Sequence, residues 1–149
     1  MTQYLADSNI FLALASSGHP HNPIVTGWFD GFTKTDRMAF CRLTQLSFMR
    51  LLTTQEVMRQ HTLTNQQALS QVHLFLSDPR MEYVVEPNGL EERWLTLASA
   101  HQKAPKLWMD AYLAGFSELT GRRLVTFDKG FRQFKALDVL VLTVSQSPA

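Results

Sequence analysis

Cysteine is almost absent from this 149-residue chain, because Cys41 is the only one. A single cysteine excludes an internal disulfide and a thiolate metal cage, and its place at the end of an apolar segment favours a buried side chain over a nucleophile. The N-terminus also lacks the basic segment and cleavage site of a secretory signal, and no apolar run reaches the roughly 20 residues that cross a bilayer. We therefore expect a protein of the reducing cytoplasm, with no membrane partner.

A large net charge is absent as well. The chain has 14 lysines and arginines and 13 acidic residues, a formal net charge of +1. No global positive field indicates a nucleic-acid partner, so such a partner would have to meet a local patch. From His101 onward seven basic residues face four acidic ones, which places a local positive excess in the last third of the chain.

Internal repeats, low-complexity tracts and Gly/Ser-rich linkers are missing, which indicates a single domain over residues 1–145 and a short loose tail over 146–149. Strand-like apolar segments alternate with helical ones. This alternation implies βαβ units, so we predict an α/β fold with a central, mostly parallel sheet of about five strands sandwiched by helices. Strands are predicted over 3–7, 37–41, 82–86, 122–128 and 138–144.

Helix starts are marked by a cap residue before proline and by two capping-box spacings. These signals lie at Asn22 with Pro23, at Thr64 with Gln67, and at Asn88 with Glu91. The helices carry more large apolar side chains than one core of this size needs, which predicts a homodimer contact. Candidates for that contact are Phe48, Met49, Leu52, Val57 and Met58.

Three carboxylates interrupt apolar segments. Asp7 ends the first strand, Asp128 ends the strand that contains "LVTF", and Asp110 lies inside the helix "LWMDAYLAGF". Ligands of open parallel sheets bind beyond the carboxyl ends of the strands, so Asp7 and Asp128 share one edge. The helix of Asp110 runs antiparallel to the strand that follows it, which brings its first turn to the same edge. We expect the three carboxylates to lie within reach of one divalent ion.

A cluster of carboxylates repels itself unless a cation offsets its charge. The histidines are scattered without ligand spacing, so the ligand set is all oxygen and suits Mg²⁺ or Mn²⁺ rather than zinc. Such a site binds phosphate esters and activates water. Each acid also has a structural interpretation: Asp7 as a helix cap, Asp128 as the cap of the next turn, and Asp110 as the partner of Lys106.

Three blocks of the sequence resemble one known family. "LADSNIFLAL", "LTQLSFMRLLTTQEVM" and "MDAYLAGFSELTGRRLVTFDKGF" occur in the order typical of PIN domains of the VapC toxin type, from Tyr4 to Phe131. The resemblance implies the PIN fold and an Mg²⁺-dependent endoribonuclease, the toxin of a toxin–antitoxin pair. It implies an RNA substrate, an antitoxin partner and a homodimer. It also implies that Asp7, Asp110 and Asp128 are metal ligands, and that Thr126 supports the site.

The resemblance is weakest at Gln45, where many PIN domains have glutamate. Glutamine cannot act as a base and binds a divalent ion less strongly, so we interpret Gln45 as a weak ligand or an indirect support. Arg50 on the same helix is predicted to hold a phosphate, or to form an ion pair across a dimer interface or with the site acids. The basic residues near the acids are predicted to position the RNA backbone: Lys106, Arg122, Arg123 and Lys129.

Two other functions remain open. Gln45 is compatible with a PIN-fold binding module whose catalytic site is weakened. A metal-dependent phosphatase on a doubly wound sheet is the other alternative. It is disfavoured because "DSN" after the first strand lacks the second aspartate expected of an aspartyl-phosphate enzyme.

Overall fold

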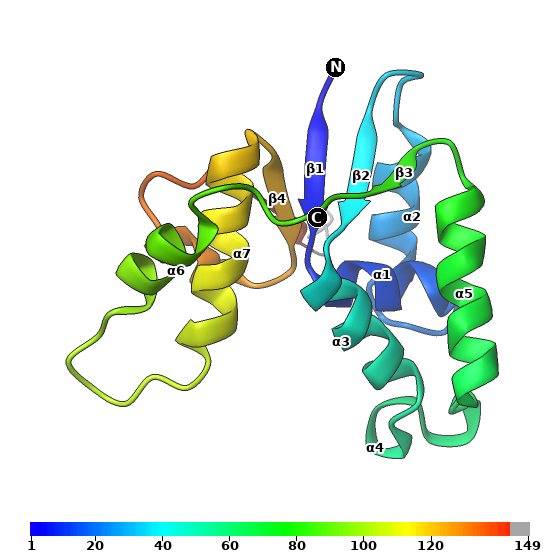
Figure 1. Ribbon diagram of the computed structural model, residues 1–149. Helices are drawn as coiled ribbons and strands as arrows, with labels where there is room; N and C mark the ends of the chain where they lie inside the picture. The colour runs from blue at the N-terminus through cyan, green and yellow to red at the C-terminus, as the bar shows by residue number, and fades with distance from the viewer. Residues whose placement is uncertain (144–149) are drawn as a thin grey trace, which may run out of the picture.

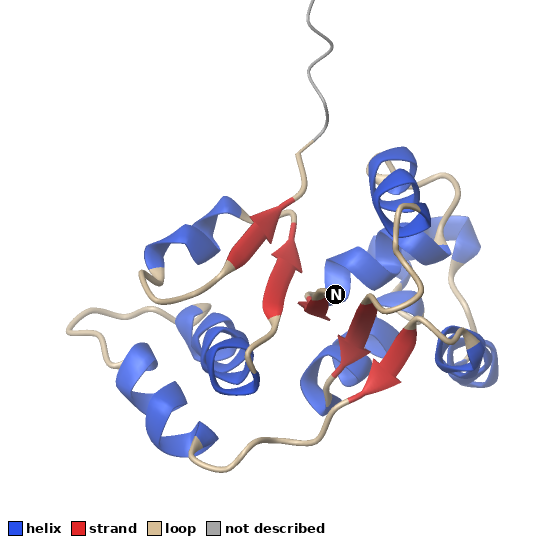
Figure 2. Ribbon diagram, turned by 90° about the horizontal axis from the view of Figure 1, so that it is seen from above, coloured by secondary structure: helices blue, strands red, loops and turns tan. Residues whose placement is uncertain are grey.

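Five short strands form one sheet in the computed structural model, which describes residues 1–143. The order is β3-β2-β1-β4-β5 and all four pairings are parallel, which confirms the predicted sheet. Viewed from above, β1 lies at the centre of the molecule (Figure 2). The strands are β1 (Gln3–Ala6), β2 (Arg37–Phe40), β3 (Met81–Tyr83), β4 (Arg123–Thr126) and β5 (Val139–Val141).

Helices cover both faces of the sheet (Figure 1). One group comprises α1 (Ser8–Ala15), α2 (Asn22–Asp30), α3 (Arg42–Leu52), α4 (Gln55–Met58) and α5 (Asn65–Ser77). The other comprises α6 (Leu90–Ala98) and α7 (Leu107–Thr120), and two short turns of 3₁₀ helix are η1 (Arg59–His61) and η2 (Lys129–Gln133). In the part of the chain that the structure describes, no helix is both long and apolar enough to span a membrane.

The sheet separates two apolar layers. Leu5 and Leu124 belong to the layer beneath α6 and α7, whereas their neighbours Ala6 and Val125 belong to the layer with α1, α3 and α5. Successive side chains of a strand point to opposite faces, and all four of these side chains are fully buried. This burial on both faces explains why the strand segments are apolar runs rather than alternating ones.

The helix starts agree with the sequence signals in part. The Thr64 hydroxyl accepts a hydrogen bond from the Gln67 N–H at 3.2 Å, and the Gln67 side chain accepts one from the Thr64 N–H at 2.9 Å. This capping box confirms the prediction for α5. The other two starts are wrong by one residue. α2 already includes Asn22, and Gly89 rather than Asn88 precedes α6, with a left-handed φ of 84° that favours glycine.

The edge strands are shorter than predicted. β3 has three residues instead of the predicted 82–86, because this edge strand finds partners only along β2. β5 ends at Val141, whereas the prediction ran to residue 144. That last residue and the predicted tail over 146–149 lie outside the described part of the chain.

Two of the residues predicted for a dimer contact belong to the core instead. Phe48 is fully buried and Leu52 is nearly so, and both pack in the layer with α1 and α5. Val57 is 42% exposed, so it remains available to a partner. Cys41 is fully buried, as predicted, and its N–H donates to the Thr44 hydroxyl at the start of α3.

Candidate active site

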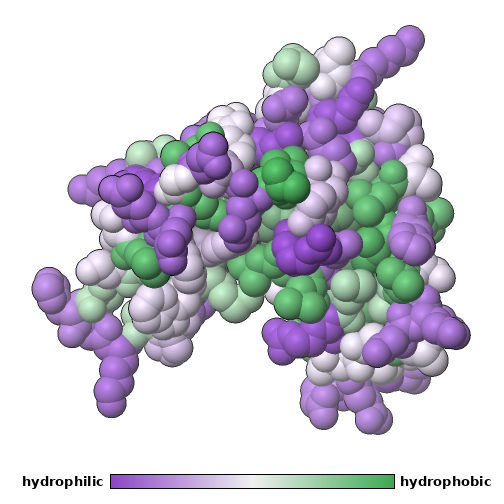
Figure 3. All heavy atoms as spheres, viewed as in Figure 1, coloured by the Kyte–Doolittle hydropathy of each residue, from purple (hydrophilic) through white to green (hydrophobic). Residues whose placement is uncertain are grey.

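The acid-bearing loops meet where the sheet changes its direction of winding. From β1 the chain adds β2 and β3 on one side and then returns to add β4 and β5 on the other. The crevice beyond the carboxyl ends of β1 and β4 is therefore a topological switch point, the usual ligand site of such sheets. Asp7 follows β1 directly and Asp128 follows β4 by two residues. The surface is hollowed below the strands, between the α7 side and the α3 side (Figure 3).

One hydroxyl group links the loops after β1 and β4. The Asp7 carboxylate accepts from the Ser8 N–H at 2.8 Å through Oδ1, which caps α1, and from the Thr126 hydroxyl at 2.9 Å through Oδ2. Thr126 Oγ1 accepts in turn from the Asp128 N–H at 3.0 Å, and its side chain is fully buried. The Asp7 N–H donates to the Val125 carbonyl at 3.0 Å, so the backbones are joined as well. The helix-cap interpretation of Asp7 is correct and compatible with a place in the site.

Lys106 joins the other two acids. Its ammonium donates to Asp128 Oδ2 and lies 3.8 Å from Asp110 Oδ2. Lys106 immediately precedes α7 and Asp110 lies in the first turn, so the i, i+4 spacing places both on one face. Asp128 Oδ1 accepts from the Gly130 N–H at 2.7 Å, which also makes Asp128 the cap of η2. The structural interpretations of Asp110 and Asp128 are therefore correct too.

The three carboxyls differ in pKa because their surroundings differ. Burial raises the pKa of Asp7, and the negative charge of Asp128 adds to the rise. Burial raises the pKa of Asp110 to about 6, where Lys106 opposes the rise and the other two acids add to it. The hydrogen bond from Lys106 lowers the pKa of Asp128. A cation that offsets their negative charge would therefore stabilise the ionised forms of two of the three carboxyls, Asp7 and Asp110.

The donor set fits a hard divalent ion in its chemistry. Carboxylate oxygens supply every candidate ligand, which favours Mg²⁺ or Mn²⁺ over zinc. A cation, the Lys106 ammonium, already contacts two of the three carboxylates. Within residues 1–143, however, no group of three His, Cys, Asp or Glu side chains is placed so that it could hold a metal ion. That Asp7, Asp110 and Asp128 together bind one ion stays a prediction.

The remaining predicted site residues make no described hydrogen bond with the three acids. Gln45 lies in the first turn of α3, which starts where β2 ends, and its amide oxygen accepts from Arg42 Nη1 at 2.5 Å. Arg50 is exposed further along α3 and makes no ion pair within the described residues. Lys129 is exposed beside Asp128. The sequence interpretation missed Arg42, although i, i+3 spacing on a helix signals such a pair.

Arg122 is not available to a substrate, contrary to the prediction for it. Its side chain is 8% exposed and donates to Glu82 Oε1 at 2.5 Å and to the Tyr4 carbonyl at 3.3 Å. Arg123 lies 3.2 Å from Asp138. Both arginines therefore pair with neighbours in the fold, and the exposed lysines remain as the positive groups beside the acids.

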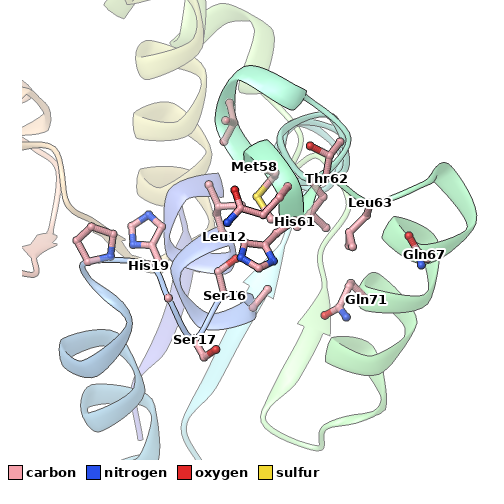
Figure 4. A pocket seen from close by; sticks show the side chains of 16 residues that line it. Leu12, Ser16, Ser17, His19, Met58, His61, Thr62, Leu63, Gln67 and Gln71 are labelled. Atoms are coloured by element: carbon pink, nitrogen blue, oxygen red, sulfur yellow. The ribbon is translucent and has the colours of Figure 1, made fainter.

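A second hollow lies apart from the acids. A cavity of about 740 Å³ is lined by the ends of α1 and α3, by α4 and by the start of α5. His19, from the loop after α1, points toward it, as do Met58 and His61 from the continuous segment of α4 and η1 (Figure 4). No acidic side chain of the described residues lines it. The cavity is thus a separate feature from the carboxylate site.

Comparison with known proteins agrees with the fold. Residues 4–137 match the PIN domain family, which covers most of the chain. The chain therefore belongs to the PIN-domain family. Its relatives place it within the VapC ribonuclease group: Ribonuclease VapC41 of Mycobacterium tuberculosis is 42% identical over 142 residues, which are 93% of this chain and 97% of the relative.

Solved structures of low sequence identity show the same fold. The structure of VapBC2 from Rickettsia felis, bound to a DNA fragment from the promoter, has a TM-score of 0.72 at 14% identity, and the match covers 95% of this chain and 100% of the other. VapC20 of Mycobacterium tuberculosis, a Sarcin-Ricin loop cleaving toxin, has a TM-score of 0.69 at 14% identity, with 91% and 98% covered.

Proposed function

We propose that this chain is an Mg²⁺- or Mn²⁺-dependent endoribonuclease and the toxin half of a toxin–antitoxin pair. The observation that carries the proposal is the linkage at the switch point. One buried hydroxyl ties Asp7 to the loop of Asp128, and one ammonium ties Asp128 to Asp110. The identity with a relative named a ribonuclease supports RNA as the substrate.

Asp7, Asp110 and Asp128 would hold the divalent ion. An ion held by carboxylates activates water and neutralises charge on a phosphodiester. The chain itself supplies the positioning. Thr126 fixes one oxygen of Asp7, which leaves the acid a single orientation. The exposed side chains of Lys129 and Arg50 would contact phosphates of the RNA backbone, which positions the strand without selecting its sequence. The Lys106 ammonium, predicted for the same role, pairs with Asp128 and Asp110 instead.

The partners follow from the relatives. Solved neighbours of this fold include VapBC2 from Rickettsia felis and VapBC-1 from nontypeable Haemophilus influenzae. We therefore propose an antitoxin protein as the partner of this chain. We also propose a homodimer, which the exposed apolar side chains of Leu46 and Val57 support, and the cytoplasm as its location, which the single cysteine supports.

A weakened binding module is the second candidate, and Gln45 is the observation that favours it. A neutral amide replaces the carboxylate that many PIN domains have there, and Arg42 holds its oxygen. A module of this kind would keep the fold and the antitoxin contact while losing Asp7-dependent metal binding.

RNA cleavage by the purified chain tests the proposal. We expect cleavage of RNA with Mg²⁺ or Mn²⁺, none with EDTA, and none with the Asp7→Asn variant at the same concentration. Expression of the chain alone should arrest growth, and Asp7→Asn should not. Cleavage of small phosphomonoesters but not RNA would favour the phosphatase alternative. Growth arrest that persists in Asp7→Asn would favour the binding module.

A further inference from the structure

We propose that Lys106 takes the place of one divalent ion in the acid site, so that each chain binds a single divalent ion. The inference rests on the proposed metal-dependent function. It goes beyond that function, because it states that one side chain, Lys106, sets the number of divalent ions that the site binds.

The geometry places the ammonium between two of the acids. It donates to Asp128 Oδ2 and lies 3.8 Å from Asp110 Oδ2. The other oxygen of Asp128 already accepts from the Gly130 N–H at 2.7 Å. A second divalent ion, added to the one that the three carboxylates would hold, would therefore compete with the ammonium for Asp128 Oδ2. Within residues 1–143, both ion pairs made by Asp7, Asp110 or Asp128 come from Lys106.

The charge balance supports a single ion. One divalent ion together with one ammonium neutralises three carboxylates. Two divalent ions beside the same ammonium would leave the site with a net charge of about +2 before RNA binds, and like charges this close repel strongly. Gln45 is neutral, so α3 adds no fourth negative charge at the position where many PIN domains have one.

The position of Lys106 in the chain keeps its ammonium at the site. Pro105 precedes it and α7 begins directly after it, which fixes the backbone from which the side chain extends. The side chain is 70% exposed, whereas that of Asp110 is 13% exposed. The ammonium thus reaches from solvent to a half-buried carboxylate, and its removal should leave the core intact.

Manganese binding to the full chain tests the inference. Isothermal titration and electron paramagnetic resonance of free Mn²⁺ would be compared for wild type, Lys106→Met and Lys103→Met. Lys103 is the matched control, because it is exposed, lies three residues away and makes no ion pair within the described residues. We expect one Mn²⁺ per chain in wild type and in Lys103→Met. In Lys106→Met we expect a second Mn²⁺, and the first bound on the order of tenfold more tightly.

The opposite results would overturn the inference. They are two Mn²⁺ of similar affinity in wild type, or a Lys106→Met variant that titrates like Lys103→Met. Lys106→Arg keeps the charge and should bind one ion, which separates charge from shape. Thermal melting in EDTA confirms that each variant is folded. Wild type that cleaves RNA with Mn²⁺ while Lys106→Met binds no differently rejects this inference alone. Wild type that binds no Mn²⁺ and cleaves no RNA rejects the proposed function as well.

Discussion

The Thr126 hydroxyl donates to Asp7 Oδ2 at 2.9 Å, although the two residues are 119 positions apart in the sequence. The oxygen of this Thr126 hydroxyl also accepts a hydrogen bond from the Asp128 N–H, because a hydroxyl has one hydrogen to donate and two lone pairs that accept. Thr126, at the end of β4, thereby sets the orientation of the Asp7 carboxylate. Several measurable properties of the site depend on this contact.

Thr126→Val removes the hydroxyl and keeps the shape of the side chain. The Asp128 N–H and one Asp7 oxygen lose their partner, so we expect the free energy of unfolding to fall by about 1–3 kcal/mol. Cleavage activity and Mn²⁺ affinity should fall about 10–100-fold, as for other supports of metal ligands. Urea unfolding and Mn²⁺ titration measure the two effects. Thr126→Ser keeps the hydroxyl and should retain most of both properties, and a Thr126→Val variant that binds Mn²⁺ like wild type would contradict this account.

Asp7→Asn should separate charge from helix capping. Asparagine caps a helix about as well as aspartate, and the neutral amide avoids the burial cost that raises the pKa of Asp7. We expect an equal or higher melting temperature in EDTA and no Mn²⁺ binding. Asp7→Ala lacks the cap and should be less stable by about 1 kcal/mol. Equal destabilisation by both changes, with Mn²⁺ binding retained, would contradict this account.

Asp110 should make the metal-free protein less stable as the pH rises. Its pKa is raised from 3.8 to about 6 in the folded state, so the folded state binds more protons between these values. Stability therefore falls through this window and is constant above about pH 6 as far as this group is concerned. Asp110→Asn should be more stable than wild type by on the order of 2 kcal/mol at about pH 7.5, and not at pH values near 4. Urea unfolding in EDTA across this range measures the difference, and a constant difference would disprove it.

Gln45→Glu should raise the affinity for Mg²⁺, because it adds a carboxylate at the edge where the other acids lie. Arg42 holds the oxygen of Gln45 at 2.5 Å and would compete with the ion for the new charge. The gain should therefore be larger in the double variant Gln45→Glu with Arg42→Ala. Titration with Mg²⁺ and cleavage at low Mg²⁺ check this. If neither variant changes either property, Gln45 is a structural residue only.

A homodimer should form through the exposed apolar side chains of α3 and α4. Leu46 is 58% exposed and Val57 is 42% exposed. Sedimentation at micromolar concentration should give about twice the chain mass of 17.0 kDa, and Leu46→Glu should shift the protein toward monomer. A wild-type monomer at that concentration would rule out the dimer.

The sheet and the edge that carries the acids were predictable from the sequence, because both follow from the alternation of apolar strand segments with helical segments. Each strand is an apolar run between helices, and the residue after such a run must lie at the carboxyl edge. Asp7 and Asp128 could be placed from this rule alone. Thr126 entered only through the family resemblance, since a buried hydroxyl in a strand has no signal of its own.

Contacts between distant side chains could not be predicted. Arg122 is buried because it pairs with Glu82, which lies on β3, three strands away from β4 in the sheet and 40 positions earlier in the sequence. The i, i+4 spacing indicated a pair between Lys106 and Asp110, but it did not indicate that the ammonium also reaches Asp128. The N-cap of α6 is Gly89 rather than the predicted Asn88, because the backbone at this position has a positive φ. No local sequence pattern indicated that conformation.

The position of β4 beside β1 has a consequence for synthesis in the cell. β1 is synthesised long before β4, with which it pairs. β4, Asp110 and Asp128 all lie more than 100 residues after β1 begins. A ribosome-bound chain that ends before β4 has only one of the three acids attached to a sheet and lacks the Thr126 hydroxyl that orients it. Such a nascent chain cannot assemble the site. Whatever this site attacks, the ribosome that makes the protein is exposed to it only after β4 and Asp128 have been made.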